Sequence, residues 1–71
     1  MKDITVYGGP GCPACTTAKQ YLDSKGIEYK YLEVGTDITP QEFVEKTNSR
    51  SVPVIIIDGV QHIGWNQELF N

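Results

Sequence analysis

The sequence predicts an α/β fold, a four-stranded mixed sheet with helices on both faces. Strand-like and helix-like segments follow one another in the order strand, helix, strand, helix, strand, strand. The first strand–helix–strand unit requires a right-handed parallel crossover. The last two strands are joined by Asp58-Gly59, a hairpin signal that makes them antiparallel. A chain of 71 residues accommodates one small domain, which we expect to span residues 1–71.

The first predicted strand covers Asp3 to Tyr7, which are mainly β-branched or aromatic. A glycine-rich loop over residues 8–11 follows, and Pro13 then suits the first position of a helix, where its missing N–H costs nothing. Gly26 ends this helix. Helical spacing predicts one apolar face, made by Cys15, Ala18 and Leu22.

The second predicted strand runs from Ile27 to Val34, with charged residues between its apolar ones that suit a sheet edge. Thr39-Pro40-Gln41-Glu42 forms a capping box with proline at the first helical position. The short helix that it starts is expected to end at about Asn48 and to bury Phe43.

The aliphatic run from Val54 to Ile57 predicts a central strand that is buried on both faces. Val60 to Ile63 is the strand that returns after the hairpin. Asn66 is expected to cap a final helical turn from Gln67 to Phe70, where the chain ends.

Cys12-Pro13-Ala14-Cys15 is the most informative motif, and it contains both cysteines of the chain. Residues three apart on a helix have Cα atoms roughly 5 Å apart, inside the range that a disulfide can bridge. A disulfide across so short a loop restricts the unfolded chain little, so a purely structural role is the weakest interpretation. Because the helix start favours an anion, Cys12 is the predicted nucleophile and Cys15 the resolving thiol. This motif after the first strand indicates thioredoxin-like redox chemistry.

Composition narrows the class of function. The formal net charge of −3, from scattered charges, argues against a nucleic-acid partner. No apolar run approaches the ~20 residues of a membrane span, and no signal region follows Met1, so we expect a cytoplasmic protein with no membrane partner. Two cysteines and one histidine cannot complete a four-ligand metal site in one chain, so no metal site is expected.

The chain resembles the glutaredoxins over essentially its whole length. The matching segments are Tyr7 to Lys19, with the family's Cys-Pro-x-Cys and Ala-Lys, Ser51-Val52-Pro53, where the family has Thr-Val-Pro, Ile57-Asp58-Gly59 and His62-Ile63-Gly64. The resemblance implies a thioredoxin-like sheet in the order 2-1-3-4, with the first and last helices on one face and the last helix truncated. It also implies a cis Val52-Pro53 bond beside the cysteines, with backbone groups of Val52 free to pair with a peptide or glutathione.

Around the cysteine pair we expect three supporting residues: Pro13, Lys19 and Pro53. The residues expected to line the substrate groove are Gly11, Arg50, Val52, Pro53, Trp65, Asn66 and Gln67. The helix start near Asn66 favours a carboxylate. Trp65 is either an apolar platform for a partner or a cap on the thin sheet.

The resemblance implies a monomeric, dithiol thiol–disulfide oxidoreductase without a bound cofactor. Its substrates would be protein or glutathione-mixed disulfides, ribonucleotide reductase among them, with glutathione as co-substrate. Gly9 replaces a lysine with which many glutaredoxins read a glutathione carboxylate, and Ala14 replaces their usual tyrosine. Trp65 after a glycine is more similar to the redoxins dedicated to ribonucleotide reductase, which take electrons from thioredoxin reductase. The other alternative is an iron–sulfur carrier, a dimer that holds a 2Fe–2S cluster with glutathione thiols.

Overall fold

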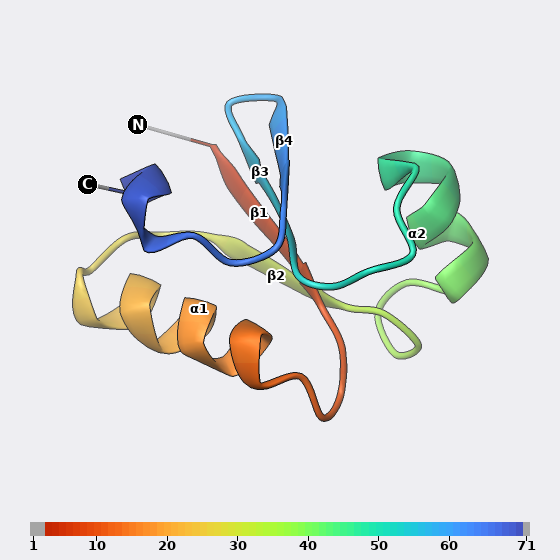
Figure 1. Cartoon of the computed structure of the whole chain (residues 1–71), viewed down its shortest axis with the longest axis horizontal. Coiled ribbons are helices and arrows are strands. Elements are labelled where there is room, and N and C mark those ends of the chain that lie inside the picture. The colour runs from red at the N-terminus through yellow and green to blue at the C-terminus, as the bar shows by residue number, and fades with distance from the viewer. Residues whose placement is uncertain (1–2, 71) are drawn as a thin grey trace.

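The computed structural model describes residues 3–70 of the chain (Figure 1). In chain order the elements are β1 (Ile4–Gly8), α1 (Pro13–Ser24), β2 (Lys30–Glu33), α2 (Pro40–Thr47), β3 (Val54–Ile57), β4 (Val60–Ile63) and the 3-10 helix η1 (Gln67–Phe70). The strands form one sheet in the order β2-β1-β3-β4. β1 pairs with β2 in parallel and with β3 antiparallel, and β3 pairs antiparallel with β4. The predicted mixed sheet and its strand order are confirmed.

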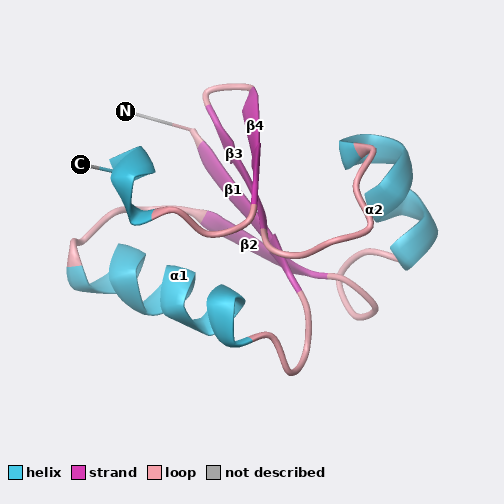
Figure 2. Ribbon diagram, in the orientation of Figure 1, coloured by secondary structure: helices cyan, strands magenta, loops and turns pink. Residues whose placement is uncertain are grey.

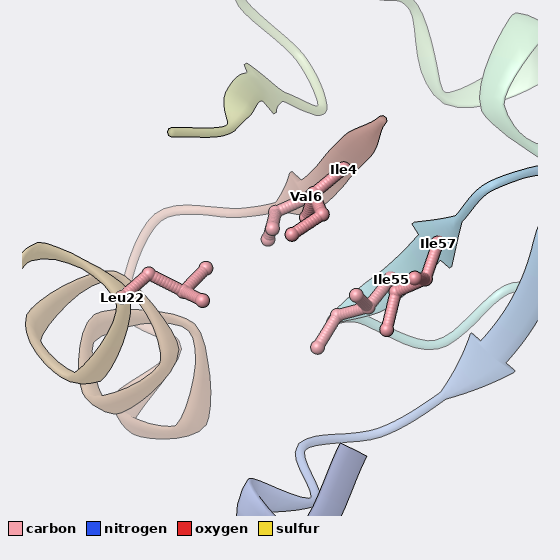
Figure 3. Packing of buried hydrophobic residues seen from close by; sticks show 5 residues of the cluster. All are labelled: Ile4, Val6, Leu22, Ile55 and Ile57. Atoms are coloured by element: carbon pink, nitrogen blue, oxygen red, sulfur yellow. The ribbon is translucent and has the colours of Figure 1, made fainter. Parts of the chain in front are cut away.

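The two faces of the sheet carry separate cores, because successive strand residues point to opposite sides. On one face, Leu22 of α1 packs against Ile4, Val6, Ile55 and Ile57 (Figure 3). On the other face, Phe43 of α2 packs with Tyr7, Ile38 and Val54. Figure 2 shows α1 and η1 on one side of the sheet and α2 on the other, as the sequence predicts.

Both predicted helix starts are present. Cys12 is the N-cap of α1 with Pro13 in the first turn, and the Thr39 hydroxyl accepts the N–H of Glu42 at 3.1 Å to cap α2. Asn48, with a φ of 56°, ends α2 in the left-handed conformation. None of the helices within residues 3–70 combines the length and the apolar composition needed to cross a membrane.

The second strand is shorter than predicted. It pairs with β1 only from Lys30 to Glu33, and not from Ile27. The Ile27 N–H donates to the Leu22 carbonyl at 3.0 Å, so this residue still closes the end of α1. Ile27 and Tyr29 nevertheless pack against the α1-side core. Their alternation therefore reports burial, which the sequence pattern does not distinguish from pairing in a sheet.

Candidate active site

The two cysteines lie where the chain passes from β1 into α1. Their sulfurs are bonded to each other, and their Cα atoms are 5.3 Å apart. Cys12 is half-buried, whereas Cys15, one turn further along the helix, is 1% exposed. Cys12 is therefore the more accessible residue of the pair.

The start of α1 favours negative charge on Cys12. The Cys15 backbone N–H donates to the Cys12 sulfur at 3.2 Å, and the first turn contains no acidic residue. A free N–H and the dipole at a helix start are in general a favourable environment for a thiolate. Pro13 occupies the first turn without removing a donor that the thiolate uses.

The segment before β3 lies next to the cysteine loop. The Val52-Pro53 peptide bond is cis, as predicted. Val54 lies opposite Tyr7 in the sheet, so Pro53 stands level with the end of β1. A Cβ placed on Gly9 would lie 3.6 Å from Val52, which shows how closely the two segments approach. The buried Pro53 is tied to the end of β4, because its carbonyl accepts the Gly64 N–H at 2.7 Å.

A small polar network holds this segment from behind. The buried Thr47 hydroxyl donates to the Phe43 carbonyl at 2.7 Å and accepts the Ser49 N–H at 3.2 Å. The Ser49 hydroxyl in turn accepts the Ser51 N–H at 3.2 Å. The side-chain amide of Gln61 on β4 donates to the Thr47 carbonyl. The sequence analysis did not predict this network. Its only signal in the sequence is the pair of hydroxyl residues Thr47 and Ser49, near the end of a helix and shortly before Pro53.

The side chain of Lys19 is engaged on the neighbouring strand. Its ammonium lies 4.4 Å from the ring centroid of Tyr31, a cation–π contact. The Tyr31 ring also covers Gly8, where an added Cβ would overlap the tyrosine hydroxyl and ring carbons. Burial, followed by the charges of Glu33 and Asp37, raises the pKa of Tyr31, so this phenol is neutral at physiological pH.

The residues after β4 differ in their surroundings: some pack against the core, and others are exposed. The Trp65 ring meets Tyr21 edge-on at 5.5 Å and stacks on Phe70 at 5.8 Å, so it caps the α1-side core. The Asn66 side chain accepts the Glu68 N–H at 3.0 Å and caps η1, as predicted. Gln67 is exposed. The predicted final helical turn, Gln67–Phe70, is present as a 3-10 helix.

Beside the cysteine loop lies a groove of about 440 Å³. Its walls are the loop after β1, the start of α2 and the segment before Pro53. The lining residues are Gly9, Pro10, Val34, Pro40, Phe43, Val44, Arg50 and Val52. Of the predicted groove residues, the structure brings Arg50 and Val52 together here. The other predicted groove residues are not among its lining residues: Gly11, Pro53, Trp65, Asn66 and Gln67. The other lining residues escaped prediction because they come from separate segments of the chain.

Metal-ligating side chains are not clustered in the part of the chain that the structure describes. Within residues 3–70, no group of three or more histidine, cysteine, aspartate or glutamate side chains is placed to hold a metal ion.

The chain is similar to known proteins in both sequence and fold. A family model described as Glutaredoxin matches residues 4–63. A glutaredoxin of Neisseria meningitidis serogroup A is 38% identical, with 99% of this chain and 84% of that protein covered. The crystal structure of a glutaredoxin from Archaeoglobus fulgidus has a TM-score of 0.79 at 24% identity, covering 97% of this chain and 82% of that one. NrdH-redoxin from Escherichia coli has a TM-score of 0.78 at 22% identity, covering 94% and 88%.

Proposed function

This chain belongs to the glutaredoxin family and is a thiol–disulfide oxidoreductase, and on that premise we propose that it reduces protein disulfides and glutathione-mixed disulfides with two thiols. The observation that carries this proposal is the unequal pair at the start of α1. Cys12 is accessible and accepts an N–H, while Cys15 is buried at bonding distance behind it.

The proposed reaction starts from the reduced protein. The Cys12 thiolate attacks one sulfur of the substrate disulfide, so that a Cys12–substrate disulfide forms and the first substrate thiolate leaves and takes up a proton. Cys15 loses its proton and attacks the Cys12 sulfur. The Cys12–Cys15 disulfide forms, and the second substrate thiol is released. Two electrons have passed from the protein to the substrate, and the protein is left with the bonded pair.

The backbone at Val52 supports the proposed docking of substrate. The residue is half-buried and precedes a proline, next to the cysteine loop. An extended peptide, or glutathione, would pair with its backbone as one more short strand and present its sulfur to Cys12. The hydrogen bonds through Thr47 and Ser49 hold this backbone in place.

Glutathione is the electron donor that we propose. Two glutathione molecules would return two electrons to the Cys12–Cys15 disulfide and leave as one glutathione disulfide. The cycle suits a reducing compartment such as the cytoplasm, and the protein would act as a monomer. The alternative donor is thioredoxin reductase. It is favoured by the likeness to NrdH-redoxin, described as a glutaredoxin-like protein with a thioredoxin-like activity profile, and ribonucleotide reductase is then the proposed target.

Coupled turnover tests the proposal. One arm supplies NADPH, glutathione reductase and glutathione, and the other supplies NADPH and thioredoxin reductase, each with a small disulfide as substrate. We expect NADPH consumption in the glutathione arm, and none with Cys12→Ser in either arm. Turnover in the thioredoxin reductase arm alone would reverse the order of the two donors, and absence of turnover in both would contradict the proposed activity.

A further inference from the structure

The loop that carries Cys12 is positioned by its two ends. Between β1 and α1 the chain runs through Gly9, Pro10 and Gly11, and Gly11 has a φ of 68°. Glycine leaves the backbone freer than any other residue, and it has no side chain that anchors a loop. The place of Cys12 therefore depends on where β1 ends and where α1 begins.

The ring of Tyr31 touches both of these ends. Tyr31 lies on β2, opposite Val6 of β1. Its ring fills the space that a side chain of the buried Gly8 would take, since an added Cβ there would overlap the ring and its hydroxyl. On α1, the ammonium of Lys19 lies 4.4 Å from the centroid of the same ring. One side chain of β2 thus bridges the last residue of β1 and the helix that Cys12 begins.

The end of β1 is itself fixed to β2. Gly8 pairs with Glu33, and its carbonyl accepts the Val34 N–H at 2.7 Å. The contact through Tyr31 adds what this backbone pairing does not supply, a connection from the end of β1 to α1. Because Gly8 directly precedes the loop and Lys19 follows it on α1, the ring connects the two segments between which the loop runs.

The sulfur of Cys12 is sensitive to the course of this loop. Cys12 is the N-cap of α1, with an extended backbone (φ −104°, ψ 103°), and its sulfur accepts the Cys15 N–H at 3.2 Å. An N-cap side chain reaches such an N–H from a non-helical backbone. A change in the loop at Cys12 therefore moves the sulfur away from this donor, and a thiolate there loses part of its stabilisation.

We propose that Tyr31 is a positioning residue for Cys12. Its ring, held between Gly8 and Lys19, keeps the start of α1 in place against the sheet and so keeps the Cys12 sulfur at the Cys15 N–H. Lys19 acts through this ring and not by placing its charge at the sulfur. The inference rests on the proposed function, in which Cys12 is the nucleophile, and adds a residue that acts on Cys12 without contacting the substrate.

Alkylation of the reduced protein tests the inference. Iodoacetamide reacts with the thiolate, so the rate at Cys12 as a function of pH reports how well the site stabilises this anion. Mass spectrometry identifies the alkylated residue. For Tyr31→Leu we expect the curve to move to higher pH. Below the wild-type midpoint Cys12 should then react roughly 2- to 5-fold more slowly, the range for loss of an exposed cation–π contact. Tyr31→Phe keeps the ring and should keep the wild-type curve.

Tyr29→Leu is the matched control for stability. Tyr29 is also half-buried against the α1-side core, but its hydroxyl donates to Asp23, near the end of α1 away from the cysteines, at 3.1 Å. The substitution removes a similar ring, and we expect it to lower the free energy of unfolding while the alkylation curve stays that of the wild type. Urea denaturation of the reduced proteins measures their stability.

Lysine substitutions distinguish the ring contact from a long-range effect of charge. Lys19→Met removes the ammonium and leaves the ring in place, so this arm does not depend on how well Tyr31→Leu folds. We expect it to shift the curve in the same direction as Tyr31→Leu and to add little when the two are combined, because both remove one contact. Lys25→Met is the control. The Lys25 ammonium lies 5.6 Å from the ring centroid of Tyr21, at the other end of α1, and its loss should leave the curve unchanged.

The outcomes distinguish the inference from the function on which it rests. A wild-type curve for Tyr31→Leu would overturn the inference, and so would an equal shift in Tyr29→Leu or in Tyr31→Phe. Additive shifts of Lys19→Met and Tyr31→Leu would also overturn it, because Lys19 would then act by its charge. In each of these cases a wild type that is alkylated first at Cys12 leaves the proposed function standing. If Cys15 reacts faster than Cys12 in the reduced wild type, the proposed function itself fails in its assignment of the nucleophile.

Discussion

The two faces of the sheet differ in how completely they are covered. On the α1 side, a 12-residue helix and the turn η1 cover the strands, and the rings of Tyr21, Trp65 and Phe70 close the remaining gap. On the α2 side, an 8-residue helix leaves a groove next to the cysteine loop. One face thus uses its aromatic residues to complete a core, and the other leaves apolar surface available. We infer that the α1 side supplies stability and the α2 side supplies recognition.

The largest effect is expected at the cysteines, which belong to the chemistry and not to the core. Cys12→Ser should lower disulfide reduction by at least roughly 1000-fold, because no other accessible sulfur can form the first mixed disulfide. The free energy of unfolding of the reduced protein should change by less than about 1 kcal/mol. Cys15→Ser should accumulate the mixed disulfide on Cys12, which mass spectrometry detects. A Cys12→Ser protein that still turns over would contradict the role of this residue.

The second-largest effect is expected in the core between α1 and the sheet. Leu22→Ala removes a side chain that is fully buried between α1 and the sheet, and it should lower the free energy of unfolding by roughly 2–5 kcal/mol. Ile63→Ala is the matched control, since Ile63 is 63% exposed on β4, and it should change stability by less than about 0.5 kcal/mol. Urea denaturation of the reduced proteins measures both. Equal losses would mean that the α1 side is not where stability is concentrated.

A positive charge added beside the groove, on the α2 side of the sheet, should change the affinity for glutathione and not the stability of the fold. Gly9→Lys restores the ammonium that many glutaredoxins place before their cysteines, and its Cβ would make only an ordinary contact with Val52. A charge-assisted hydrogen bond contributes about 1.5–3 kcal/mol, so glutathione should bind on the order of 10- to 100-fold more tightly. Val60→Lys adds the same charge at the far end of the sheet and should leave glutathione binding as it is. Calorimetric titration with S-methylglutathione measures the affinity of the wild type and of the two variants.

The smallest effect is expected in the hydrogen-bond network that joins the end of α2 to the segment before Pro53. Thr47→Val keeps the shape of the side chain but leaves the Ser49 N–H without its acceptor, which should cost about 1–2 kcal/mol in unfolding free energy. Because this hydroxyl also holds the backbone before Val52, KM for a peptide disulfide should rise more than kcat falls. Thr17→Val removes an exposed hydroxyl on α1 and is the control. An unchanged KM would mean that the network stabilises the fold without positioning the substrate.

Local patterns on both sides of the sheet were predicted from the sequence, whereas contacts between distant residues were not. The stripe of Cys15, Ala18 and Leu22 and the capping box at Thr39 are local patterns, and both elements formed as expected. The spacing of Cys12 and Cys15 is also a local pattern, and it predicted correctly that their Cα atoms lie within the range of a disulfide. The parallel pair of β1 and β2 followed from the crossover rule, and the antiparallel pair of β3 and β4 from the Asp58-Gly59 hairpin. The order of all four strands followed from the resemblance to the glutaredoxins.

What escaped prediction depends on contacts between distant residues. The sequence did not show that the Ile27 amide would be used by α1, and so did not show where β2 begins. The groove joins residues from Gly9 to Val52, none of which is unusual in its own segment. Trp65 had two equal interpretations until Tyr21 and Phe70 were placed beside it.

The ring stack at the end of the chain has a spectroscopic consequence. Trp65 is the only tryptophan, and its ring lies on Phe70, in the last turn that the structure describes. Its fluorescence emission therefore reports whether η1 remains docked on α1. Undocking of that turn would hydrate the indole and shift its emission to longer wavelength while the far-ultraviolet circular dichroism of the sheet and helices stays constant. Two optical signals recorded on the same heated sample would thus separate release of the chain end from cooperative melting.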